Sequence, residues 1–166
     1  MSSFRLRRAA LLATVLSAAV AAGPVWAAGD SDDSDDSSRV ERADPDYRAA
    51  ETRIGQGDYQ GAIALLEEVA QRDPQNADAF NYLGYANRKL GHFEAALGHY
   101  RRALELEPRH RGAHEYLGEL YLQTGKLVQA EELLASLDRI CFFGCEEYDE
   151  LKEKVEAYKA GRLPAG

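Results

Sequence analysis

Two cysteines, Cys141 and Cys145, are the side chains best suited to chemistry in this 166-residue chain. They lie four residues apart, whereas a thiol-redox pair favours Cys-x-x-Cys beside a thioredoxin-like sheet, and the sequence shows no convincing strand. A turn is expected between them, so a disulfide that closes this turn is the favoured interpretation, with Cα atoms about 4.4–6.8 Å apart. A thiol-redox or metal-handling accessory factor using Cys141 and Cys145 is the alternative.

Two histidines, His110 and His114, have the i, i+4 spacing that places two ligands on one face of a helix. A metal site would need further ligands, and the repeat described below puts His114 at a packing position and His110 in the preceding turn. Packing is therefore the favoured role for both. The sequence contains no nucleophile-base motif, phosphate loop or metalloprotease helix, so we expect no enzyme, no catalytic residue, no cofactor and no metal.

The elements that position these residues follow an internal repeat of 34 residues. With Ala77 as position 1, small residues recur at positions 8 and 20, and a glycine recurs at position 15. The three sets are Ala50, Gly84 and Gly118, then Ala62, Ala96 and Ala130, then Gly57, Gly91 and Gly125. The pattern predicts a helix, a glycine turn and a second helix in residues 43–76, 77–110 and 111–144. One such pair cannot bury its own apolar face, so the copies are expected to stack.

The first-helix pattern recurs once more near the end of the chain. Tyr148, Leu151 and Val155 fall at positions 4, 7 and 11 of a fourth copy, which begins at Cys145. Position 8 of this copy is Lys152, which is too long for the close approach of another helix. Residues 145–166 are therefore predicted to form a capping helix and a tail.

A 34-residue period with this pattern resembles the tetratricopeptide repeat family. The resemblance implies an all-α fold, a right-handed α-α superhelix (solenoid) of three helix-turn-helix repeats plus a C-terminal capping helix. The segment Cys-Phe-Phe-Gly-Cys-Glu-Glu-Tyr at residues 141–148 also resembles the C-terminal signature of small exported bacterial members. That second resemblance implies no known enzymatic activity.

In such a stack the first helices line a concave side, and positions 2, 5, 6, 9 and 13 point into it. The predicted partner-binding groove comprises Tyr47, Arg48, Glu51, Asn81, Tyr82, Tyr85, Lys89, Glu115, Tyr116 and Glu119. Its four tyrosines suit an extended peptide or a partner helix, although they could instead fill seams between repeats. The basic carboxylate clamp of chaperone-binding members is not reproduced as a set: Asn81 matches one polar position, while Glu51 and Glu119 would compromise a clamp.

The first 42 residues predict export. Three arginines at 5, 7 and 8 precede an apolar run at residues 9–22, which is typical of a signal peptide spanning residues 1–27 and cleaved after Ala27 or Ala28. A retained membrane anchor is the alternative, but the run is shorter than the roughly 20 residues that a spanning helix needs. The aspartate-rich residues 28–42 predict an acidic disordered linker.

The net charge of −8 argues against a nucleic-acid partner. The signal-like residues 1–27 predict a periplasmic or secreted protein without a stable membrane anchor after cleavage. Its expected role is a non-catalytic protein-protein interaction scaffold or adaptor of the bacterial cell envelope, which binds a peptide or partner helix in its groove.

Overall fold

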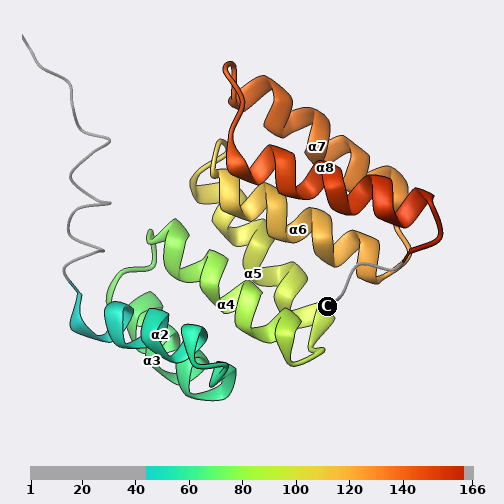
Figure 1. Ribbon diagram of the computed structural model, residues 1–166. Coiled ribbons are helices and arrows are strands. Elements are labelled where there is room, and N and C mark those ends of the chain that lie inside the picture. The colour runs from blue at the N-terminus through green and yellow to red at the C-terminus, as the bar shows by residue number, and fades with distance from the viewer. Residues whose placement is uncertain (1–43, 163–166) are drawn as a thin grey trace, which may run out of the picture. The chain divides into compact units, whose positions relative to one another are not determined.

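The computed structural model describes residues 44–162, so the predicted signal peptide and acidic linker lie outside the described residues. Seven helices and no strand occur between residues 44 and 162 (Figure 1). They are α2 (Pro45–Gly55), α3 (Tyr59–Arg72), α4 (Ala77–Lys89), α5 (Phe93–Leu106), α6 (Arg111–Gln123), α7 (Leu127–Ile140) and α8 (Glu146–Lys159). In this part of the chain no helix has the length and apolar character needed to cross a bilayer.

Glycine turns join the helices into pairs, α2 with α3, α4 with α5 and α6 with α7. Gly57, Gly91 and Gly125 sit in these turns with φ of 77°, 79° and 74°. Backbone in this left-handed region strains residues that carry a Cβ, so glycine is the favoured residue there. The turn geometry is the physical reason for the repeated glycine at position 15.

A second set of glycines allows close helix packing at position 8. A Cβ added to Gly84 would lie 2.5 Å from a ring carbon of Tyr100, and one added to Gly118 would lie 2.6 Å from a methyl carbon of Leu151. Tyr100 and Leu151 are fully buried. The missing side chains therefore provide the space in which α5 packs on α4 and α8 packs on α6.

The core is a chain of apolar clusters, each shared by neighbouring helices. One cluster joins α2, α3 and α4 through residues such as Leu66 and Leu83. Another joins α5 and α6 through Tyr100 and Leu117. The last contains Leu122, Ala130, Leu137, Leu151 and Val155, so α8 covers the face that α6 and α7 leave open. The structure confirms the predicted all-α repeat solenoid with its capping helix.

Side-chain caps fix where several of the first helices begin. The carboxylate of Asp44 accepts hydrogen bonds from the backbone N–H groups of Asp46 (2.8 Å) and Tyr47 (3.3 Å), and Pro45 occupies the first turn. Asn76 accepts from the N–H of Ala79 in the same way at the start of α4. These bonds satisfy amide groups that have no partner within the helix.

Candidate functional site

The structure brings the predicted groove residues onto neighbouring first helices, but with different degrees of burial. Tyr47, Asn81 and Glu115 are only 4%, 5% and 4% exposed. Five others are partly buried, namely Tyr82, Tyr85, Lys89, Tyr116 and Glu119. Arg48 and Glu51 are exposed on α2. Tyr47 therefore belongs to the core between α2, α3 and α4 rather than to an open surface.

The tyrosines link each first helix to the next. The rings of Tyr47 and Tyr82 are 5.7 Å apart and join α2 to α4, while the rings of Tyr85 and Tyr116 are 5.0 Å apart and join α4 to α6. Tyr59 of α3 also lies against Tyr85, at 6.1 Å. These rings fill seams between repeats, and Tyr82, Tyr85 and Tyr116 still keep part of their surface in solvent.

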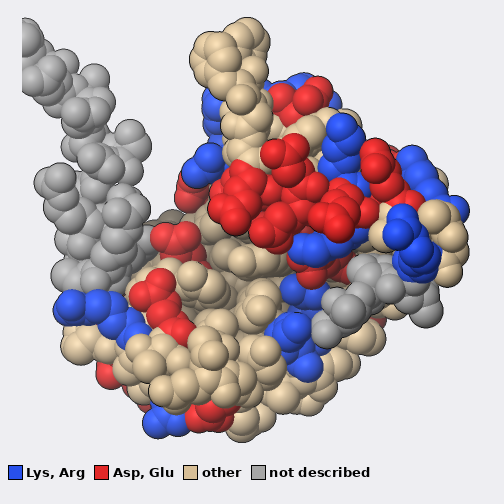
Figure 2. All heavy atoms as spheres, viewed as in Figure 1, with Lys and Arg blue, Asp and Glu red and all other residues tan. Residues whose placement is uncertain are grey.

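A cleft of ≈ 550 Å³ opens between the first halves of α4, α6 and α8. Four predicted groove residues line this cleft: Asn81, Tyr82, Glu115 and Tyr116. Most of its other lining side chains are charged, with Asp78, Glu107, Glu146, Glu147 and Glu150 outnumbering Arg109 and Arg111. Figure 2 shows acidic side chains gathered over α8 on this face.

Sequence reasoning missed the contribution of α8 to the cleft, because that helix was interpreted only as a cover. A signal was present, since Glu146 and Glu150 occupy positions 2 and 6 of the fourth copy, the same positions that define the groove in the first three. Extending the register by one copy would have selected both. The loop residues Glu107, Arg109 and His110 fall outside every helix and carry no such signal.

A network of charged side chains lies beside the cleft and shares Glu115 and Glu150 with its lining. The ammonium group of Lys154 contacts the carboxyl groups of Glu119, Glu150 (3.1 Å) and Glu115 (3.4 Å). On the other side of Glu119, the guanidinium of Arg88 pairs with its carboxylate at 2.7 Å, and the side chain of Arg88 is 2% exposed. The network therefore ties α4, α6 and α8 together.

Aromatic rings surround the buried guanidinium. The Cζ atom of Arg88 lies 5.4 Å from the ring centre of Tyr85 and 5.9 Å from that of Tyr116, and its Nε donates to the hydroxyl of Tyr100 at 3.4 Å. Both rings present π-electron density to the cation. Burial raises the pKa of the Tyr100 hydroxyl above its ordinary value.

Two polar side chains at the cleft, Glu115 and Asn81, are buried, and the oxygen of Asn81 has no hydrogen-bond partner among the described residues. Burial and a hydrogen bond with Glu150 raise the pKa of Glu115, although Lys154 acts in the opposite direction. The Oδ1 atom of Asn81 is buried and accepts no hydrogen bond from any residue in the range 44–162. The backbone of Gly112 lies against the amide of Asn81, because a Cβ there would come 3.2 Å from its Nδ2.

The histidines are engaged in packing and capping. The Nδ1 atom of His110 accepts from the N–H of Ala113 at 3.1 Å, so its Nε2 carries the proton that it donates to Asp78 at 2.9 Å. His114 is buried, and its Nε2 donates to the carbonyl of Pro108 at 3.0 Å. The two histidine side chains thus hold the start of α6 in place.

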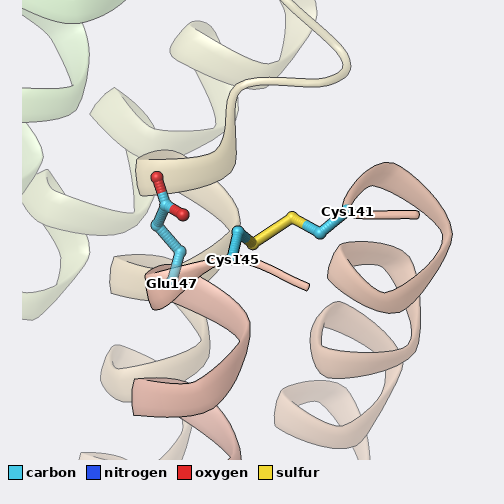
Figure 3. Close-up of side chains that lie close together, drawn as sticks. All are labelled: Cys141, Cys145 and Glu147. Carbon is cyan, nitrogen blue, oxygen red and sulfur yellow. A yellow bond between two sulfur atoms is a disulfide. The ribbon is translucent and has the colours of Figure 1, made fainter. Parts of the chain in front are cut away.

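The cysteines form a disulfide at the turn between α7 and α8, as Figure 3 shows. Their Cα atoms are 5.6 Å apart, inside the range expected for such a bond. Glu147 lies nearby at the start of α8. Both sulfurs are bonded to each other, so in this state they offer neither a free thiol nor a thiolate ligand. The loop projects two aromatic side chains, Phe142 at 85% and Phe143 at 96% exposure.

Known structures share this architecture. SycD, a type III secretion translocator chaperone of Yersinia enterocolitica, was solved with a peptide of the translocator YopD; it superposes with a TM-score of 0.61 at 20% identity, covering 75% of this chain and 92% of that one. The complex of the TPR2B domain of yeast Sti1 with pHsp70 superposes with a TM-score of 0.64 at 16% identity, covering 76% and 98%. At such identities the likeness concerns the fold.

A curated relative is a much longer protein. The chain is 30% identical over 95 residues to the protein CTR9 homolog of Arabidopsis thaliana, a match covering 56% of this chain but only 9% of that protein. The tetratricopeptide repeat model matches residues 47–105 and 88–141, more than half of the chain. Together with the glycine turns and the stacked helix pairs, this match shows that the chain belongs to the tetratricopeptide repeat family.

Proposed function

We propose that this protein is a non-catalytic interaction module of the bacterial cell envelope, which binds an extended peptide or a helix of a partner protein. The observation that carries the proposal is the cleft between α4, α6 and α8, since its volume of ≈ 550 Å³ is in the range of ligand sites. Half-buried Tyr82, Tyr85 and Tyr116 lie along the same helices and offer rigid rings with a hydroxyl.

The fold supports a binding role but does not identify the partner. The structures of SycD with a YopD peptide and of Sti1 with pHsp70 are complexes on the same helix arrangement. A rigid stack of helices holds its side chains in place before a partner arrives, so little conformational entropy is lost on binding.

The proposed location rests on the signal-like residues 1–27 and on the disulfide, since such bonds persist in oxidising compartments. Cell fractionation with N-terminal sequencing of the mature protein tests it. A periplasmic or secreted protein that begins at residue 28 or 29 is the expected result, whereas an intact N-terminus in the cytoplasm would refute export.

Site-specific photo-crosslinking tests the binding role. A photoreactive residue in place of Lys89, beside Tyr85, should capture a partner in the native compartment. The double variant Tyr82→Ala/Tyr85→Ala should lose most of the captured product, while the control Arg101→Ala, an exposed residue on α5, should not. Equal capture by the double variant and the control would show that the groove is not the binding surface.

A further inference from the structure

The charge network beside the cleft has more carboxyl groups than cations to balance them. Oxygen atoms of Glu115, Glu119 and Glu150 all lie within 4.8 Å of one another. Two cations meet them, Lys154 and the buried Arg88. Burial and the neighbouring carboxyl group of Glu150 raise the pKa of Glu115. Three carboxyl groups in this network therefore share two cations.

A second and independent feature points the same way. Asn81 is 5% exposed and lines the same cleft from α4, and its Oδ1 receives no hydrogen bond from the described residues. A buried acceptor without a donor costs free energy in a folded protein. Lys154 donates to the carboxyl groups, but they still outnumber the cations, and the Oδ1 atom of Asn81 has no donor among the described residues.

The acidic side chains at the helix starts have a different explanation. Asp78, Glu146 and Glu147 lie in the first turns of α4 and α8, where carboxylates offset the helix dipole. Glu115 and Glu150 lie one turn further along α6 and α8 and face each other. The helix dipole therefore accounts for the first three carboxylates but not for this pair.

We propose that the cleft binds the guanidinium group of an arginine side chain in the partner segment, against Glu115, Glu150 and the amide oxygen of Asn81. This inference rests on the proposed binding role of the groove. A guanidinium carries five N–H donors in a planar fork, which matches several acceptors better than an ammonium group does. Tyr82 and Tyr116 line the same cleft, so aromatic surface lies beside the proposed guanidinium.

The surrounding charges favour an organic cation over a metal ion. The ammonium of Lys154 already contacts all three carboxyl groups and repels any further cation, but at equal distance it repels a divalent ion about twice as strongly as a singly charged guanidinium. Of the two arginines that line the cleft, Arg111 is drawn toward Glu147 at 3.5 Å, and both are exposed and therefore screened by solvent. The acidic side chains over α8 in Figure 2 attract a cationic segment to this face.

The test is an NMR titration of the ¹⁵N-labelled protein with three capped peptides, acetyl-Gly-Gly-X-Gly-Gly-amide, in which X is arginine, lysine or glutamate. The arginine peptide should shift the backbone signal of Gly112 and the side-chain amide signals of Asn81 in a saturable manner. Lysine should bind more weakly, and glutamate should leave these signals in place. Glu150→Gln should weaken arginine binding about tenfold, the factor expected for one charge-assisted hydrogen bond.

Matched variants keep the result decisive. Glu115→Gln resembles the protonated carboxyl and should fold, and Glu150→Gln alters an exposed residue. Glu132→Gln, an exposed glutamate on α7, is the control and should bind arginine as the wild type does. Arginine affinity that is unchanged in both cleft variants would overturn the proposal, as would equal shifts with the glutamate peptide.

Two further outcomes separate this inference from the proposed function. If calcium chloride, and not the arginine peptide, shifts the same signals, the carboxyl groups bind a divalent cation and the arginine assignment is wrong. If no peptide binds while photo-crosslinking still depends on Tyr82 and Tyr85, the groove remains the binding surface and only the arginine assignment falls.

Discussion

Replacing Gly84 with alanine tests the close packing between α4 and α5. The new Cβ would lie 2.5, 2.6 and 2.9 Å from three ring carbons of Tyr100, well inside ordinary contact distance. The ring has little room to move, since Tyr100 is fully buried and its hydroxyl is bonded to Arg88. Either the ring or the helix must shift, so we expect the variant to be destabilised.

A second glycine on the same helix pair supplies the control. Gly98 lies in the interior of α5, and a Cβ there would meet nothing within 4 Å. Alanine is favoured over glycine in a helix interior by about 1 kcal/mol, so Gly98→Ala should be stabilised by about that amount. Gly84→Ala has the same helical gain but adds an overpacking cost of about 1–3 kcal/mol. The difference between the two variants isolates the contact with Tyr100.

Urea unfolding followed by circular dichroism measures both free energies of unfolding. The expected order of stability is Gly98→Ala above wild type, with Gly84→Ala lower than Gly98→Ala by about 1–3 kcal/mol. The stability of Gly118→Ala should lie between those of Gly98→Ala and Gly84→Ala, because its new Cβ meets the flexible methyl ends of Leu151. Equal stability of Gly84→Ala and Gly98→Ala would refute the reasoning, since the helices would then have room for a methyl group at position 8.

Three further predictions concern the disulfide loop and the first helix. Replacing Cys141 and Cys145 by serine removes a disulfide that closes a short loop, which should lower the free energy of unfolding by about 2 kcal/mol. Hydrogen exchange should become faster in α7 and α8 before the rest of the chain unfolds. Phe142→Ser/Phe143→Ser should change the free energy of unfolding in urea by no more than about 0.5 kcal/mol, because both rings are exposed. Burial alone would raise the pKa of Asp44, but hydrogen bonds from Arg72 and from the backbone of Asp46 and Tyr47 outweigh it and lower the pKa. The ionised Asp44 carboxylate therefore stabilises the fold above the ordinary carboxyl pKa, and this stabilisation is lost as pH falls through the lowered pKa. Asp44→Asn keeps a capping oxygen but cannot ionise. Its free energy of unfolding, measured from pH 7 to pH 2, should therefore fall less steeply with decreasing pH than that of the wild type.

The repeat register was readable from the sequence because each position has a local physical cause. Gly57, Gly91 and Gly125 are required by the backbone of the turns, and Gly84 and Gly118 by the space that a neighbouring helix needs. Such demands recur with every copy, so the period itself reveals them. The helix pairs and the capping helix follow from that register.

The cleft could be predicted only in part. Asn81, Tyr82, Glu115 and Tyr116 were identified from their positions, but the burial of Tyr47 depends on how closely α2 approaches α4. The distance between two helices depends on the side chains of both, so it cannot be predicted from the sequence of one repeat copy alone.

The burial of Arg88 also could not be predicted from the local sequence. An arginine next to Lys89 near the end of α4 would be expected in solvent. It is buried because Glu119, Tyr85 and Tyr116 converge on its guanidinium from two helices. The partner carboxylate lies 31 residues away in the sequence, so local patterns cannot pair the two.

The bridge between Cys141 and Cys145 also bears on how the protein matures. Since the sequence contains two cysteines, only one intramolecular pairing exists, and oxidation cannot trap a mispaired isomer. The two sulfurs are brought together across a sequence separation of 4, so they can meet before α7 and α8 have packed. An oxidant is therefore sufficient to complete the covalent structure, and a disulfide isomerase would find no wrong bond within the chain to correct.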